Sequence, residues 1–235
     1  MTGSPLYGNL DEWNKSLFSK PLQTLTSQDL SLFAGKVIST WGDTNDLKHF
    51  LPRLFELTAT LDTPYNVSIL YQKLQDGAFQ TWEIEEQKVV NEFSIALLDN
   101  LLNDNREKAE WEFDDYFSAL AHFHSSFNDL TELWTSNDSF SSIKHLTNYI
   151  YNEAHNLFGK NHIRGNEQST GNIAAFKNWL LTDNLIQKLT NAFYQFEKTE
   201  LAEKISWVIK ILEDEKYNTQ QAVLRQQGTT NKPSS

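Results

Sequence analysis

Apolar residues recur every three or four positions along most of this chain, which is the spacing of the buried side of an amphipathic helix. Thr26 is a residue type that caps helix N-termini, and Gly42 suits the end of the helix that follows it. The stripe between them consists of Leu30, Phe33, Val37 and Trp41. The same spacing predicts further helices over residues 45–61, 64–77, 83–103, 113–135, 140–158, 172–181, 183–197 and 199–213.

The segments outside these helices divide the chain into three parts. Residues 1–22 are predicted to form an N-terminal segment with a short helix, and residues 23–216 a single all-α domain. The one long irregular stretch within that domain is KNHIRGNEQSTGN, residues 160–172. Residues 217–235 are polar and lack periodicity, so we expect a disordered tail there.

Short connections between the predicted helices favour antiparallel helical hairpins, about eight to ten helices in all. Four tryptophans, Trp41, Trp82, Trp134 and Trp179, follow one another at separations of 41, 52 and 45 residues. This is close to the ~40–47 residues of a HEAT or armadillo repeat. The predicted fold class is therefore all-α, with a short curved HEAT-like array as one possible arrangement of the hairpins.

Composition excludes several classes of protein. The chain has no cysteine, so it can form neither a disulfide framework nor a thiolate zinc site. Nine glycines and five prolines are few for 235 residues, which disfavours a β-sandwich or barrel rich in tight turns. The opening residues do not resemble a secretory signal, and the longest apolar run, residues 95–98, is far shorter than the ~20 residues of a membrane-spanning helix. We expect a cytoplasmic protein that does not enter membranes.

The net charge of −11 is concentrated in the first half of the chain. Residues 1–120 carry 19 acids against 9 bases, and residues 76–115 alone carry 12 acids against 3 bases. Such a surface would repel nucleic-acid phosphates, so nucleic-acid binding is disfavoured. A basic protein partner is favoured instead.

Pro52 interrupts an otherwise helical pattern, because its ring removes a backbone donor and crowds the carbonyl group of Lys48. Apolar residues on both sides of it predict a helix that continues through the proline with a bend. A polar row lies beside this apolar stripe at spacings of three, four and three residues, which places its members on one helix face, with Asp46 near His49 and Arg53 near Glu56. The row consists of Asp46, His49, Arg53 and Glu56.

The string TWGDTNDLKHFLPRLFEL, residues 40–57, resembles a signature of a family of uncharacterised bacterial proteins, T-W-G-x-x-x-D-[FL]-[KR]-H-F-L-P-R-[IL]-x-E-L. The resemblance covers 18 of the 235 residues. It implies a bacterial, all-helical protein of similar length. It carries over neither an activity nor a functional residue.

Motifs for catalysis or metal binding are not found in the sequence. None of the six histidines is three or four residues from another, so no two lie on one helix face as zinc-binding helices require. Nucleophile-elbow, dinucleotide and phosphate-loop motifs are also missing. We therefore expect no metal, no cofactor and no catalytic residue that sequence can identify.

The sequence favours a bacterial binding protein whose acidic surface engages a basic partner. The most specific version of this hypothesis is an immunity-type protein that neutralises a basic toxin. Glu107, Glu110 and Glu112 are predicted to lie in an acidic connection between two helices and to bind that partner, with the polar row as a second candidate surface. Ordinary solubility is the alternative explanation of the charge. Two other functions stay open, an enzyme whose site assembles from separate helices around His49, Arg53 and Asp46, and a structural component of a larger assembly.

Overall fold

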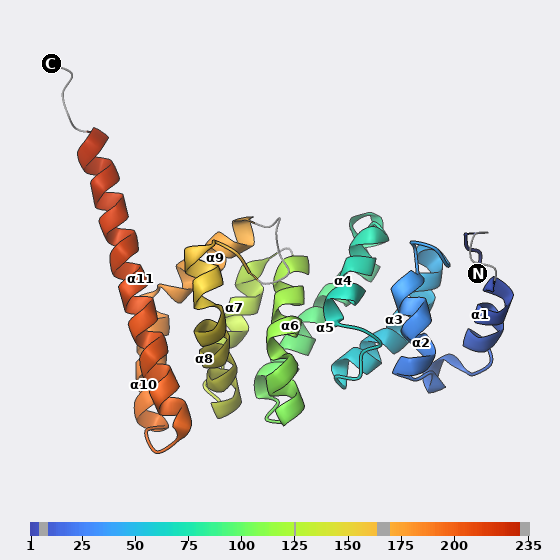
Figure 1. The fold of residues 1–235 in the computed structure, drawn as a ribbon, viewed down its shortest axis with the longest axis horizontal. Coiled ribbons are helices and arrows are strands. Elements are labelled where there is room, and N and C mark those ends of the chain that lie inside the picture. The colour runs from blue at the N-terminus through green and yellow to red at the C-terminus, as the bar shows by residue number, and fades with distance from the viewer. Residues whose placement is uncertain (5–8, 125, 164–169, 231–235) are drawn as a thin grey trace. The chain divides into compact units, whose positions relative to one another are not determined.

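The computed structural model describes residues 1–4, 9–124, 126–163 and 170–230 (Figure 1). Within these residues the regular elements are helices and no strand is present, so the predicted all-α class is confirmed. An isolated antiparallel bridge joins Gly3 to Trp41. Backbone contacts divide the chain into two compact units, residues 1–124 and residues 125–235. The single domain over 23–216 and the hairpin array stay predictions.

Unit 1 contains six α-helices in the residues described (Figure 1). Helix α2 packs against α1, α3 and α4, and α6 packs against α4 and α5. Short 3₁₀ turns at Leu22–Thr24 and Phe79–Thr81 lie in the connections. The helices are α1 Leu10–Leu17, α2 Ser27–Lys36, α3 Thr44–Ala59, α4 Val67–Asp76, α5 Ile84–Asn103 and α6 Glu107–Phe123.

Unit 2 contains five α-helices in its described part. Helix α11 packs against α10 and α8, and α7 packs against α9. A π-helical turn, His155–Gly159, extends α8 at its C-terminal end. The helices are α7 Phe127–Ser136, α8 Phe140–Ala154, α9 Thr170–Leu180, α10 Asp183–Gln195 and α11 Glu200–Thr230.

Helix α3 passes through Pro52 without interruption, as predicted. Pro52 lies on the exposed side of the helix. The carbonyl group of Lys48, which loses its helical donor, is therefore on the side that water can reach. The apolar residues of the same helix, including Leu47, Phe50 and Leu54, are buried on the opposite side. The bend at the proline stays a prediction.

Trp41 does not belong to a helix, contrary to the predicted stripe. Helix α2 ends at Lys36, and the chain then turns through Ile38, whose φ of 69° is in the left-handed region that β-branched residues rarely adopt. The turn returns Trp41 to the buried side of the helix, where its ring meets that of Phe33 edge to face, with centroids 5.7 Å apart. Its indole N–H donates to the Asn14 side chain at 3.0 Å. The contact with Phe33 therefore places Trp41 on the side that the helical spacing predicts, although the chain leading to Trp41 is not helical.

The predicted helix over residues 113–135 is wrong, because two helices cover this stretch. Helix α6 ends at Phe123, and His124 adopts an extended backbone (φ −72°, ψ 131°) before α7 begins at Phe127. Phe123 and Phe127 are both buried, so the apolar spacing stays in phase across the break and hides it. Helix α6 also begins six residues earlier than predicted, at Glu107. Acids in its first turn, Glu107 and Glu110, favour that start through the helix dipole.

Two further boundaries differ from the sequence analysis. Helix α4 begins at Val67 rather than at Pro64, because the Asn66 side chain caps it by accepting from the Ser68 N–H at 3.0 Å. Helix α11 continues to Thr230, through residues placed in the polar tail. Gln, Ala, Leu and Arg in this stretch are good helix formers, and they extend a helix that is already nucleated. Residues 231–235 lie outside the described residues. No helix in the described part of the chain is long and apolar enough to cross a bilayer.

Candidate functional site

The polar row of α3 lies on one helix side, and three of its four members are bonded within unit 1. The Asp43 carboxylate caps α3 by accepting from the backbone N–H groups of Asn45 and Asp46, at 2.8 and 3.1 Å. The Asp46 carboxylate returns the bond by accepting from the Asp43 N–H at 3.0 Å, which completes a capping box. The Asp46 carboxylate therefore serves as part of the N-terminal cap of the helix.

Arg53 holds two parts of unit 1 together. Its Nε donates to the carbonyl oxygen of Leu25 at 2.7 Å, and Leu25 is buried in the connection before α2. Its Nη1 contacts the Glu56 carboxylate at 2.7 Å, which is the pairing that the spacing predicts. His49 is exposed, and its ring meets that of Phe50 at nearly a right angle, with centroids 4.8 Å apart. These contacts give Arg53 a structural role.

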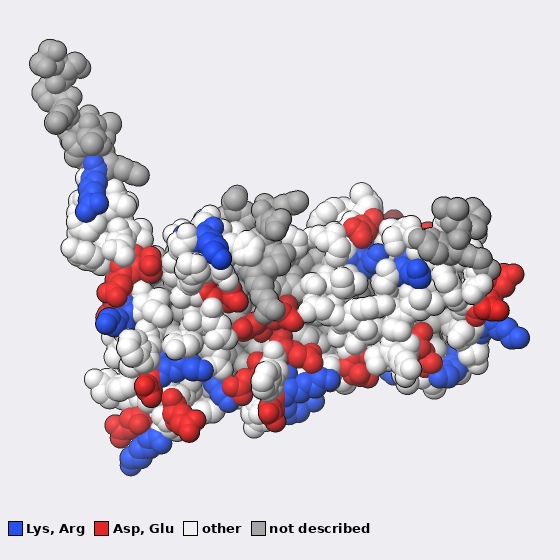
Figure 2. Space-filling model, viewed as in Figure 1, with Lys and Arg blue, Asp and Glu red and all other residues white. Residues whose placement is uncertain are grey.

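Acidic residues are frequent on α6 instead, and Figure 2 shows acidic residues among basic ones over this part of the surface. Residues 104–115 contain six acids and two bases. Glu107, Glu110 and Glu112 are helical, so their predicted place in a connection is wrong. The connection is only residues 104–106, where Arg106 contacts Asp104 through its guanidinium at 2.5 Å. This contact raises the pKa of Arg106.

The three predicted acids do not occupy equivalent places. Glu107 is exposed, and Glu110 lies three residues further along the same side. Glu112 lies at the edge of the exposed arc, 3.9 Å from Lys108. Partial burial raises the pKa of Glu112, and Asp115 adds to this while Lys108 opposes it. The Asp115 carboxylate accepts a hydrogen bond from the Asn66 side chain at 2.7 Å, which ties α6 to the start of α4.

Trp111 lies among these acids with its side chain turned to solvent. It is 79% exposed, as much as any large apolar residue in the described chain. Its indole N–H points to the Glu107 carboxylate at 3.4 Å. Glu107 lies three and four residues before Glu110 and Trp111, and Asp114 lies four and three residues after them, so the four share one side of α6. We call these four residues the acidic α6 face.

Sequence reasoning missed Trp111 because only the charges of this segment were considered. A signal was present in the string EKAEWEFDD, where an aromatic residue has acids one residue away on both sides and four residues away on both sides. It falls on the opposite side of the helix from Phe113 and Tyr116, which are buried. A tryptophan that lies outside the apolar stripe of its own helix is the sequence feature that identifies this exposed position.

The exposed side of α5 extends the acidic surface of unit 1 only in part. Glu85, Glu92 and Asp99 are exposed there, beside Val89. Glu86 is used within the unit, because its carboxylate contacts the Lys48 ammonium at 2.5 Å. This contact lowers the pKa of Glu86.

Lys48 in turn lies over the indole ring of Trp82, with Nζ 4.5 Å from the ring centroid. The Trp82 indole N–H donates to the carbonyl oxygen of Gly77 at 2.8 Å. Glu86, Lys48 and Trp82 therefore fasten α5 to α3 and to the turn that precedes α5.

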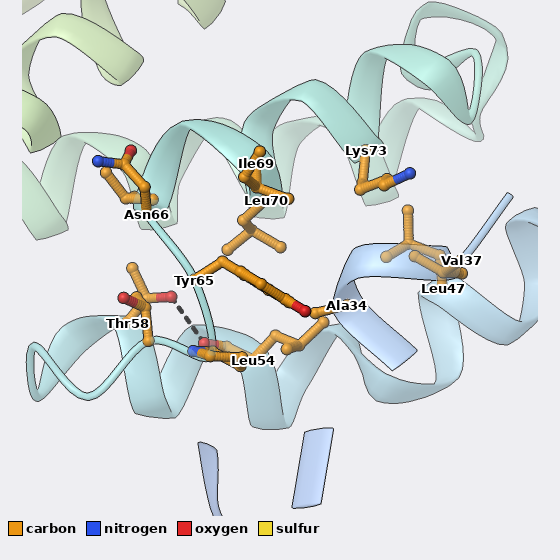
Figure 3. Close-up of a pocket in the computed structure, with 13 residues that line it drawn as sticks. Ala34, Val37, Leu47, Leu54, Thr58, Tyr65, Asn66, Ile69, Leu70 and Lys73 are labelled. Carbon is orange, nitrogen blue, oxygen red and sulfur yellow. Dashed lines mark hydrogen bonds between the residues drawn. The ribbon is translucent and has the colours of Figure 1, made fainter. Parts of the chain in front are cut away.

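A small cavity in unit 1 lies between α2, α3 and α4 (Figure 3). Its volume is about 20 Å³, room for about one water molecule. Tyr65 lies across it, and Gly35 leaves space for that ring, since a Cβ there would be 3.0 Å from the Tyr65 hydroxyl. Lys73, only 9% exposed, forms one wall and directs its Nζ to the Ser39 hydroxyl at 3.4 Å. The cavity is a packing feature too small for a substrate.

In the part of the chain that the structure describes, no three His, Asp or Glu side chains are arranged to hold a metal ion. The expectation that the protein needs no metal stays a prediction, which elemental analysis of protein purified without chelator would check. Comparisons with protein-family models, curated proteins and solved structures find no match to this chain. The resemblance over residues 40–57 therefore stays an expectation.

Proposed function

We propose that this chain is a binding protein whose acidic α6 face engages a basic protein partner. The observation that carries the proposal is the exposure of Trp111 among carboxylates. A surface that serves solubility alone needs the acids but gains nothing from a solvated indole. Tryptophan, with tyrosine and arginine, is enriched among the residues that dominate binding energy at protein interfaces.

The chemistry of the acidic α6 face selects the partner. Glu107, Glu110 and Asp114 attract a cationic surface at long range, which raises the rate of encounter. At contact the indole ring of Trp111 can receive an Arg or Lys side chain on its face, an interaction that strengthens when water is excluded. A partner with a basic rim around an apolar or guanidinium-bearing centre therefore fits this surface.

The sharpest form of the proposal is an immunity-type protein that neutralises a basic toxin. Supporting this form are the charge concentrated in one region and a helical scaffold that presents one side of α6 to solvent. The polar row of α3 contributes less to such a surface, because Asp46 and Arg53 are bonded within the unit.

The test compares captures from the native cell by four forms of the full chain, the wild type and three variants. The two test variants are Trp111→Ala and the double variant Glu107→Lys/Glu110→Lys. The control is Trp207→Ala, which removes another solvent-exposed tryptophan, 51% exposed on α11. We expect a protein of basic isoelectric point that binds the wild type and the control and is lost from both test variants. Recovery of the same proteins by all four forms would refute the proposal.

A further inference from the structure

A groove in unit 2 is lined by residues far in sequence from the acidic α6 face. It has a volume of about 460 Å³, within the range of small-molecule sites. The end of α7 and the residues after it form one wall, the end of α9 the second, and α10 the third. Its size and lining distinguish it from the cavity in unit 1.

The formal charges in this groove compensate one another. The Lys188 ammonium donates to the carbonyl oxygens of Thr135 and Asn137, at 3.2 and 2.9 Å, and contacts the Asp138 carboxylate. Lys188 is therefore occupied by the end of α7 and by the residues after it. Asp138, whose side chain is largely exposed, is the other charged residue of the lining. A groove with this balance has no net charge to attract a phosphate or a carboxylate, which favours a neutral ligand.

Four side-chain amides line the groove along one side of α10. They are Asn184, Gln187, Asn191 and Gln195, all of them exposed. Gln187 donates to the Asn191 side-chain oxygen at 2.9 Å, which orients both groups. That bond uses one of the two hydrogens of Gln187 and one lone pair of Asn191, so the pair keeps further donors and acceptors. Hydroxyl groups, which donate and accept at the same atom, match such a surface.

Trp179 supplies an apolar wall to the same groove. Its indole N–H donates to the Thr135 hydroxyl at 3.1 Å, which restrains the ring. Near-parallel rings lie beside it, Trp134 with centroids 5.9 Å apart at 14° and Phe176 at 5.8 Å and 14°. A rigid aromatic surface beside hydrogen-bonding amides suits a ligand with one C–H-rich face and a rim of hydroxyls. Sugar rings have this character.

An extended peptide fits the groove less well. Amides three or four residues apart on a helix repeat every ~4.5–6 Å. A peptide strand repeats its outward groups every ~6.6–6.8 Å. The two spacings drift apart along the four amides, so a peptide backbone would pair with only part of the row. A sugar ring carries hydroxyls around its edge and requires no such register.

We propose that this groove is a binding site for a neutral carbohydrate, with the Trp179 ring against a sugar face and the α10 amides bonded to hydroxyls. The groove is built from residues of unit 2 and the acidic α6 face from residues of unit 1, so the two proposals rest on different observations. The failure of either proposal leaves the other standing.

The experiment is an NMR titration of the full ¹⁵N-labelled chain with neutral trisaccharides of glucose, galactose, mannose and N-acetylglucosamine in both anomeric linkages. The Trp179 indole N–H resonance, assigned from its loss in Trp179→Phe, and the side-chain amide resonances of Asn191 report on the groove. We expect saturable shifts of these resonances with at least one saccharide. The double variant Asn184→Ala/Asn191→Ala should bind that saccharide about tenfold more weakly, since it lacks two hydrogen bonds.

The matched control is Asn218→Ala/Gln220→Ala, which removes two exposed amides of α11 that do not line the groove. It should bind as the wild type does. The proposal is overturned if no saccharide shifts these resonances, or if the Asn184→Ala/Asn191→Ala variant keeps the wild-type affinity. It is also overturned if a neutral glycine–serine peptide saturates the same resonances while the saccharides do not.

Discussion

Arg53 donates its Nε hydrogen to the carbonyl oxygen of Leu25 at 2.7 Å, so a guanidinium on α3 satisfies a backbone group in the connection before α2. The bond joins residues 28 positions apart. It gives the arginine that follows the proline on this helix a structural role.

Removing this bond should destabilise the fold. Arg53→Ala leaves the Leu25 carbonyl without its donor, and we expect the free energy of unfolding to fall by about 1–2 kcal/mol. His49→Ala, on the exposed side of the same helix, should change it by less than about 0.5 kcal/mol. Urea denaturation of both variants measures the difference. Equal effects of the two substitutions would contradict the structural role of Arg53.

Charge reversal at the start of α6 should also reduce stability, because Glu107 lies in the first helical turn rather than in a loop. Glu107→Lys replaces a favourable interaction with the helix dipole by an unfavourable one, which costs about 0.5–1 kcal/mol at low ionic strength. The loss should shrink in molar salt. Glu213→Lys, an exposed mid-helix control on α11, should show little of this effect. Thermal unfolding at two salt concentrations tests the prediction, which a salt-independent loss would contradict.

Trp111→Ala should leave the folded state almost unchanged, because the side chain is 79% exposed. We expect a change in unfolding free energy within about 0.5 kcal/mol. The same substitution should weaken association with the captured partner by about tenfold or more, as at interface positions dominated by tryptophan. A binding titration beside a urea titration separates the two quantities. A loss of stability as large as the loss of binding would indicate a structural residue.

Lowering the pH should remove the stability that the Asp29 carboxylate contributes at the start of α2. Hydrogen bonds from Lys20 and then from the Thr26 backbone and hydroxyl hold the pKa of Asp29 at about 2, below its ordinary 3.8. Since the folded-state pKa is lowered, the stability from Asp29 is fully present above about pH 4 and is lost as the pH falls towards 2. Asp29→Asn should therefore be less stable than the wild type near neutrality, with the difference disappearing in acid.

The direct measurement for Asp29 is an NMR titration of its carboxyl carbon in the wild type and in Lys20→Ala. Removing the lysine removes the largest cause of the lowered pKa, so the midpoint should move up towards the ordinary value. An unchanged midpoint in Lys20→Ala would show that Lys20 does not hold this carboxylate in solution.

Helical periodicity was sufficient to predict the all-α class and most of the helices. It failed where buried residues on both sides of a break stay in phase, as Phe123 and Phe127 do, and where a turn brings back an aromatic ring, as at Trp41. Local spacing correctly paired Arg53 with Glu56. It could not show that Arg53 bonds to the backbone of Leu25, because that partner depends on tertiary structure. Trp111 was within reach of the sequence, had its position relative to the apolar stripe been considered.

The parallel arrangement of Trp134 and Trp179 has an optical consequence. Two indoles at 5.9 Å and 14° are close enough for their electronic transitions to couple, which gives circular dichroism that isolated indoles lack. Both rings belong to unit 2, and a second pair of indoles, Trp13 and Trp41, lies in unit 1 with centroids 5.5 Å apart at 57°. Each unit therefore contributes a coupled signal, and Trp179→Phe leaves only that of unit 1. Far-ultraviolet helix content reports on both units together. The chain therefore carries its own spectroscopic means of telling whether its two halves melt together or one after the other.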